Sequence, residues 1–203
     1  MRKLLCAGCA ALGAAALTFL VADQPASAWE VPCDFLTGGG FIITTGSFTH
    51  DPAKANFGVG GGCKHGSPTW GHLQYIDHGN GLNVHWTAIT AYMPEGDPGD
   101  TSTDPKTGQP TGTRLICGTA RTNLLGDVDF MVRAKDAGEP GVNDEFDLRL
   151  SQGGFIVYTT ENEPNAPHKL NDGNGGGGNI QLHKPNPSTT GDFGGDCPAR
   201  AAI

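Results

Sequence analysis

Beyond its first 28 residues, the sequence lacks the features that mark helical and membrane-spanning proteins. No amphipathic helical pattern of useful length appears there, and no apolar run approaches the roughly 20 residues that a membrane-spanning helix needs. The same region has no G-x-S-x-G motif and no C-x-x-C pair. These absences argue against a helical bundle, an α/β-hydrolase nucleophile, a zinc knuckle and a thiol redox centre.

The first 28 residues are typical of a secretory signal peptide. Arg2 and Lys3 give a charged start, an apolar stretch runs from Leu4 to Ala22, and residues 26–28 form a small-residue cleavage site. We therefore expect a mature chain that begins at Trp29 and is secreted, in an extracellular or periplasmic location. No membrane insertion is expected after cleavage. The alternative is that the slightly long apolar stretch remains as an uncleaved anchor.

Basic residues are scarce in the predicted mature chain. Without Arg2, Lys3 and Asp23, the sequence has 11 basic and 20 acidic residues, which is a net charge of −9. Nucleic acids and anionic membranes favour proteins with clustered Lys and Arg. The acidic balance therefore argues against nucleic acid as a partner, and it is compatible with binding cations.

Four cysteines follow the predicted signal peptide: Cys33, Cys63, Cys117 and Cys197. An even number in an exported chain predicts two disulfides, with three possible connectivities. We favour Cys33–Cys197, which would tie the two ends of the domain together, with Cys63–Cys117 inside it. Closing so long a loop stabilises a fold by several kcal/mol in the chain-entropy model. The alternative is a free or intermolecular thiol.

Short runs rich in β-branched and aromatic residues recur after residue 37, with Gly and Pro between them. In several runs apolar and polar residues alternate, as expected for strands with one face in the core and the other in water. About nine such runs predict an all-β fold, an antiparallel β-sandwich or barrel stapled by disulfides. The runs are Gly40–Thr45, Ala55–Val59, His72–His78, Leu82–Ala91, Thr113–Thr122, Val128–Ala134, Glu145–Ser151, Phe155–Thr159 and Asn179–His183.

Composition also predicts the domain boundaries. Residues 29–184 form one all-β domain, long enough for a core of its own. Within it, residues 94–112 are too polar and Pro-rich to pack, so we expect a long exposed loop there. Residues 185–203 form a Pro/Gly-rich tail that we expect to be held only by Cys197.

Several segments, in this order, resemble the bacterial post-COAP module, a small secreted β-domain found after choice-of-anchor regions. They are TGGGFI at 37–42, ANFG at 55–58, GHLQYIDHGNGLNVH at 71–85, GTA at 118–120, DAGEPGVNDEFDLRLS at 136–151 and GGGNIQLHK at 176–184. The resemblance implies an extracellular β-domain of undefined biochemical activity and no established catalytic residues. This chain differs from the usual setting because we expect it to stand alone behind a signal peptide, and because it carries Cys63, Cys117 and the long loop at 94–112.

The segment from Gly71 to Thr90 predicts a β-hairpin with three histidines near its turn. If Asn80 and Gly81 form a two-residue turn, Ile76 faces His85, and His72, His78 and His85 share one face of the sheet. Two strand-borne histidines with a third ligand are suited to zinc or copper, and an open zinc site would activate water. The alternative is that these histidines face solvent or form hydrogen bonds within the sheet.

The loop from Asp136 to Asp144 is a second candidate metal site. Asp136, Glu139 and Asp144 would converge if its glycines fold the loop tightly, and Ca²⁺ prefers such a shell of oxygen ligands. The spacing does not match an EF-hand. The alternative is a polar turn in which the glycines and Pro140 set the backbone angles and the carboxylates face water.

Taken together, these patterns favour a secreted or cell-surface binding, adhesion or matrix domain without enzymatic activity. An extracellular glycan or a surface protein would be its partner, and Ca²⁺ is its candidate cofactor. Two alternatives remain: a metal-dependent hydrolase centred on the histidine hairpin, and a structural surface protein that self-associates through exposed strand edges.

Overall fold

The computed structural model describes residues 32–46, 51–96, 100–161, 167–173 and 175–203, so the predicted signal peptide lies outside the described residues. Ten strands and one short 3-10 helix, η1 (Pro198–Arg200), form within these ranges. The predicted all-β fold is confirmed, and each of the nine predicted runs overlaps a strand. The strands are β1 (Phe35–Thr44), β2 (Ala53–Lys64), β3 (Ser67–Asp77), β4 (Leu82–Pro94), β5 (Gly112–Thr122), β6 (Gly126–Asp136), β7 (Glu145–Gln152), β8 (Phe155–Thr159), β9 (Gly177–His183) and β10 (Gly194–Gly195).

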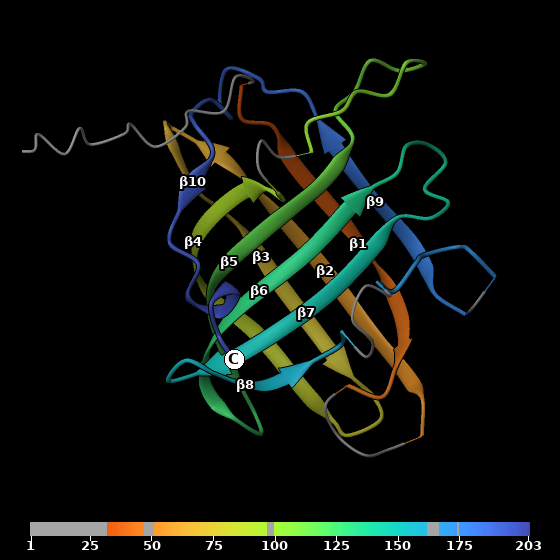
Figure 1. The fold of residues 1–203 in the computed structure, drawn as a ribbon, viewed down its shortest axis with the longest axis vertical. Helices are drawn as coiled ribbons and strands as arrows, with labels where there is room; N and C mark the ends of the chain where they lie inside the picture. The colour runs from red at the N-terminus through yellow and green to blue at the C-terminus, as the bar shows by residue number, and fades with distance from the viewer. Residues whose placement is uncertain (1–31, 47–50, 97–99, 162–166, 174) are drawn as a thin grey trace, which may run out of the picture.

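One continuous antiparallel sheet contains all of these strands. They follow the order β8-β7-β6-β5-β4-β3-β2-β1-β9, and β10 pairs with β4. From β1 to β8, neighbours in the chain are therefore neighbours in the sheet, whereas β9 returns to the outer edge of β1 and β10 returns to β4. The sheet curls into a half-barrel, with β5, β6 and β7 in front and β1, β2, β3 and β9 behind (Figure 1).

The core fills the space inside the curl. Along β3 and β4, Leu73, Tyr75, Leu82 and Val84 are fully buried, while the residues between them face outward. Strand β6 alternates in the same way apart from Met131, and the inward side chains of β6 and β7 join one hydrophobic cluster with those of β1 to β5. Nearly every residue of β5 and β7 is buried, so the outward side of these two strands is covered as well. Period-two alternation therefore sets which face of a strand packs on the core, while the covering segments decide how much of the other face is exposed.

The hairpin between β3 and β4 differs from its predicted register by two residues. His85 lies opposite Gln74 rather than Ile76, because the turn has four residues, from His78 to Gly81. Gly81 adopts φ 78° and donates its N–H to the Asp77 carbonyl. Only Gly81, and not Asn80, has the positive φ that a two-residue type I′ turn needs at both positions. A shift of two residues preserves which face each side chain occupies.

Two disulfides form, as predicted, but their predicted connectivity is wrong. Cys33 pairs with Cys63 and Cys117 pairs with Cys197. The register of β1 and β2 sets Phe35 opposite Gly62, which brings Cys33 beside Cys63 with a Cα–Cα distance of 6.0 Å. The pairing of β10 with β4 carries the tail across the sheet to Cys117, with a Cα–Cα distance of 5.3 Å.

The C-terminal tail is held by more than Cys197, contrary to expectation. The ring of Phe193 stacks on Tyr92, and Ala199 is buried against β5 and β6. The Ile203 carbonyl accepts the N–H of Ile156, so the tail also contacts strand β8. These contacts make the tail part of the folded domain.

Among the residues that the structure describes, no helix is long and apolar enough to span a membrane.

Candidate functional site

Asp136 and Asp144 bind the outer edge of strand β9. The Asp136 carboxylate accepts the backbone N–H groups of Gly138 and Leu182, both at 2.7 Å. The Asp144 carboxylate accepts those of Ala137 at 2.9 Å and Ile180 at 2.8 Å. Each carboxylate therefore joins the β6–β7 loop to alternate residues of β9.

Two amide side chains extend this series along the same edge. Asn171 donates to the Gly178 carbonyl at 2.6 Å, and Gln109 accepts the N–H of Lys184 at 3.1 Å. Residues 178, 180, 182 and 184 thus all bond to side chains where a neighbouring strand would otherwise pair. An unpaired edge is open to pairing with another chain, so this arrangement protects β9 as it closes the curl.

Burial governs the ionisation of these two carboxylates. It raises the pKa of Asp144 to about 6, against the opposing effect of the N–H groups of Ala137 and Ile180. Burial also raises the pKa of Asp136, which the N–H groups of Leu182 and Gly138 oppose. Both groups thus hold a proton more readily than an exposed aspartate does.

This arrangement bears on the predicted calcium site. All four oxygens of Asp136 and Asp144 accept backbone N–H groups, and Glu139 is exposed. Across the described ranges, no group of three or more His, Cys, Asp or Glu side chains is placed to hold a metal ion. Calcium binding stays a prediction, and the loop has a structural role that the sequence pattern did not suggest.

The hairpin histidines lie on the outward side of the sheet. His72 and His85 share one face, as predicted, with Gln74 beside them. Gln74 Oε1 lies 2.7 Å from His85 Nδ1, and His78, in the turn, bonds to Asn56 Oδ1 at 2.8 Å. His78 and His85 thus bond to neutral amide side chains of neighbouring strands. This agrees with the alternative in which the histidines form hydrogen bonds within the sheet. The transition-metal site stays a prediction.

Inside the curl, buried polar groups satisfy one another. The Arg114 guanidinium bonds to both oxygens of Asp34, which also accepts the Tyr92 hydroxyl at 2.7 Å. Toward the other end of the strands, the Tyr75 and Tyr158 hydroxyls lie 2.6 Å apart, and Tyr158 donates to Asp77 at 2.9 Å. Burial raises the pKa of both tyrosines, so they stay neutral donors. These buried polar groups thus have hydrogen-bond partners inside the core and have a structural role.

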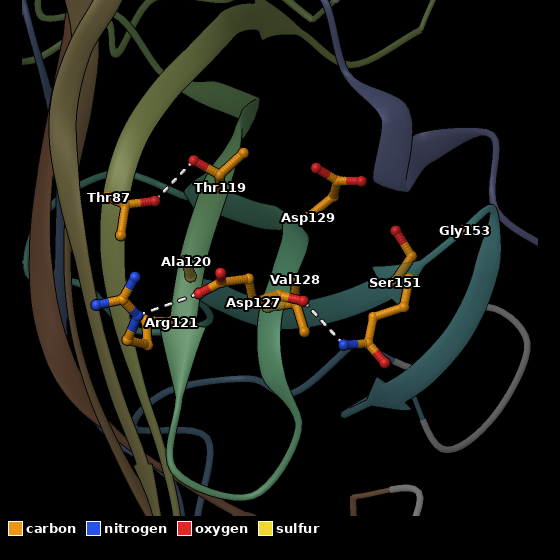
Figure 2. A pocket seen from close by; sticks show the side chains of 10 residues that line it. Thr87, Thr119, Ala120, Arg121, Asp127, Val128, Asp129, Ser151 and Gly153 are labelled. Carbon is orange, nitrogen blue, oxygen red and sulfur yellow. Dashed lines mark hydrogen bonds and ion pairs between the residues drawn. The ribbon is translucent and has the colours of Figure 1, made fainter.

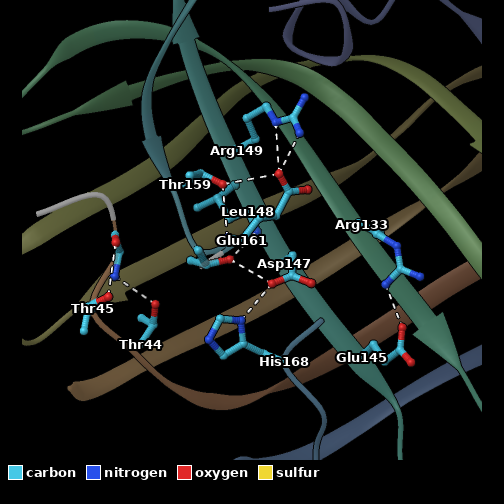
Figure 3. Close-up of polar contacts among 12 residues, drawn as sticks. Thr44, Thr45, Arg133, Glu145, Asp147, Leu148, Arg149, Thr159, Glu161 and His168 are labelled. Atoms are coloured by element: carbon cyan, nitrogen blue, oxygen red, sulfur yellow. Dashed lines mark hydrogen bonds and ion pairs between the residues drawn. The ribbon is translucent and has the colours of Figure 1, made fainter. Parts of the chain in front are cut away.

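A third polar cluster ties the segment around His168 to strand β7 (Figure 3). His168 Nδ1 lies 2.8 Å from the Asp147 carboxylate, which also accepts the Thr160 hydroxyl at 3.2 Å. Burial raises the pKa of Asp147, and the bond to His168 opposes that rise. The His168 carbonyl accepts the N–H of Phe146, so this pair positions a chain segment alongside β7.

A hollow of about 510 Å³ opens on the outward face of β4 to β7 (Figure 2). Polar and apolar atoms contribute about equally to its surface, and seven of its ten lining residues have polar side chains. A hydroxyl pair, Thr87 and Thr119, lies at one side with its oxygens 2.7 Å apart. Ser151 of β7 lies opposite Asp129 of β6. Within the described residues, Asp129 forms no hydrogen bond with this or any other side chain. The lining residues are Thr87, Thr119, Ala120, Arg121, Asp127, Val128, Asp129, Ser151, Gln152 and Gly153.

A second hollow, of about 350 Å³, shares Thr87 and Arg121 with the first and extends toward His85. Arg121 also pairs with Asp127 at 3.1 Å, with both side chains largely exposed, so solvent screens the pair and either partner is available to a ligand. The sequence did not suggest these hollows, because their residues come from four strands and share no motif. The alternating pattern of each strand was the one available signal.

No family model, curated protein or solved structure matches this chain.

Proposed function

We propose that this protein is an extracellular, non-enzymatic domain that binds a glycan in the hollow on the outward face of β4 to β7. The observation that carries this proposal is the lining of that hollow. Hydroxyl, carboxylate, guanidinium and amide groups converge there on a face that the fold leaves exposed. Such groups match the many hydroxyls of a sugar, and a few convergent polar groups in a concave site are the usual mark of ligand binding.

The roles of the other polar clusters support a binding function over catalysis. The carboxylates with raised pKa values lie at the β9 edge or beside His168, where each bonds to groups of the fold itself. The two disulfides and the signal-peptide pattern at residues 1–28 support an oxidising, extracellular setting. The resemblance to the post-COAP module supports the same setting.

A glycan microarray probed with the chain from Trp29 to Ile203 tests this proposal. We expect a hit that is lost in Asp129→Ala, whose carboxylate faces the hollow, and kept in Glu139→Ala. The latter removes an exposed carboxylate from the β6–β7 loop instead. Release of reducing ends from the bound glycan would contradict a non-enzymatic role. Equal binding by both variants would contradict the location.

A further inference from the structure

A second outward face, on the other half of the sheet, differs from the hollow in its charge. Strands β9, β1, β2, β3 and β4 contain one acidic residue, Asp77, and its side chain is buried toward the core. Lys54 and Lys64 lie at the two ends of β2, and both are exposed. In a chain with a net charge of −8, the outward face of these strands is thus free of carboxylates and carries cations.

A shallow glycine trough runs along the middle of this face. Gly58, Gly60 and Gly62 occupy alternate, outward positions of β2, and Gly39 of β1 lies opposite Gly58. A Cβ atom on Gly58 would meet no other atom within 4 Å, so the space above it is open. At Gly60 the ring of His72 covers the backbone, and at Gly62 the side chain of Phe35 does so, and both glycines are buried. The trough is therefore open at Gly58 and Gly39, toward Lys54, and is covered toward Lys64 by side chains of β1 and β3.

The side chains that border the trough are neutral hydrogen-bonding groups. Asn56 and Gln74 bond to His78 and His85, and Thr37 lies 2.9 Å from His183 Nε2 across β1 and β9. These bonds join neighbouring strands, so they hold the polar groups flat against the sheet. The face consequently presents amide, hydroxyl and imidazole groups in fixed positions.

Aromatic rings lie at both ends of the face and hold the two lysines there. Lys64 Nζ lies 6.0 Å from the ring centre of Trp70, which packs edge-on against Phe35. At the other end, Lys54 Nζ lies 4.1 Å from the ring centre of Phe41. Cation–π contact of this kind keeps an ammonium group near the surface of the sheet.

From this arrangement we propose that an acidic polysaccharide binds lengthwise along strand β2. Lys64 lies ten positions after Lys54, so at about 3.3 Å per residue they are roughly 33 Å apart, which suits an extended chain. Carboxylate or sulfate groups of such a chain meet Lys54 and Lys64 without facing any fixed carboxylate on these strands. Its hydroxyls meet the amides that border the trough. Nucleic acid fits less well, because it favours clustered cations and this face has two that lie far apart.

This inference goes beyond the hollow on β4 to β7 and uses different residues. The direct test is a titration of the mature chain with polygalacturonate, alginate and dextran sulfate. Fully methyl-esterified polygalacturonate serves as the uncharged control. We expect binding to at least one acidic chain, binding that weakens with added salt, and at least tenfold weaker binding of the esterified chain.

Two variants locate the site. Lys54→Ala/Lys64→Ala should weaken binding about tenfold, whereas Lys106→Ala/Lys135→Ala makes the same charge change away from this face and should not. Gly58→Val places a side chain in the open part of the trough. It should also weaken binding about tenfold while leaving the unfolding temperature unchanged or higher, because valine suits a strand.

Several outcomes would overturn the inference. They are failure to bind all three acidic chains, equal binding to the methyl ester, and equally tight binding to single-stranded poly(dT). Unchanged binding by Gly58→Val together with Lys54→Ala/Lys64→Ala would also overturn it. Asp129→Ala should leave polysaccharide binding along β2 intact. The variants therefore distinguish a failure of this inference from a failure of glycan binding in the hollow on β4 to β7.

Discussion

Replacing Asp144 with alanine should remove a carboxylate that joins the β6–β7 loop to the edge of strand β9. In the native fold its oxygens accept the N–H groups of Ala137 and Ile180. Alanine at this position accepts neither, and Asp144 is fully buried, so water does not readily take its place. We therefore expect the edge of β9 to loosen while the rest of the sheet keeps its pairing.

The size of the effect follows from the two N–H groups that lose their acceptor. A buried donor left without a partner costs about 1–3 kcal/mol. The Ile180 N–H is buried and counts in full, whereas the bond from Ala137 is only partly buried. We thus expect Asp144→Ala to lower the free energy of unfolding by about 2–4 kcal/mol. Asp144→Asn keeps one acceptor oxygen and removes a buried charge, so it should lose clearly less.

Urea unfolding of the oxidised protein, followed by far-UV circular dichroism, measures these differences. Asp127→Ala is the matched control, because it removes an exposed carboxylate whose ion pair is screened and should change stability by less than about 1 kcal/mol. Asp144→Ala with the stability of this control would refute the reasoning. So would a loss in Asp144→Asn as large as that in Asp144→Ala.

The same structure yields three further predictions. Burial raises the pKa of Asp144 to about 6, so the folded state holds the Asp144 proton more tightly than the unfolded state does. The contribution of this group to the free energy of unfolding should therefore fall as the pH rises from about 4 to about 6. Urea unfolding across this range should show a smaller fall in Asp144→Asn than in the native protein, and identical pH profiles would contradict this prediction. Cys117→Ala/Cys197→Ala opens a loop that spans 80 residues and should lower the free energy of unfolding by about 4–5 kcal/mol. Cys33→Ala/Cys63→Ala opens a loop that spans 30 residues and should lower it slightly less. The reverse order in urea unfolding would contradict the chain-entropy argument. Since the oxygens of Asp136 and Asp144 already accept backbone N–H groups, we expect added Ca²⁺ to leave the melting temperature unchanged. A rise with Ca²⁺ that EDTA reverses and Asp136→Ala/Asp144→Ala abolishes would contradict this expectation and favour the predicted calcium site.

Much of the fold follows from local patterns in the sequence. The alternation in Val128–Ala134 and Glu145–Ser151 predicted strands and their buried faces, because one face of each strand packs on the core. What the patterns did not determine was long-range. The disulfide pairing depends on which strand Cys33 and Cys197 lie beside, and that follows from the register of β1 with β2 and from the path of the tail.

The candidate sites were less predictable than the fold. Asp136 and Asp144 stood out as paired carboxylates, but their partners are backbone groups of β9, which lies more than 30 residues away in the chain. The glycines of β2 fall at 58, 60, 61 and 62, so the sequence alone does not mark which of them share the outward face of the strand. Whether that face was covered depended on the arrangement of the other strands. Sequence patterns thus identified Asp136 and Asp144 as notable residues, but not the groups that they contact in the fold.

If the outward faces of the sheet bind ligand while its buried carboxylates hold the fold together, a ligand should affect the two sets of residues differently. A residue-resolved NMR titration of the ¹⁵N-labelled mature chain with oligogalacturonate separates them. We predict that amide signals of Gly58, Gly60 and Gln74 shift, while those of Ile180 and Leu182 keep their positions. Shifts confined to the loop from Asp136 to Asp144, or no shifts on the outward face of β2, would contradict the account.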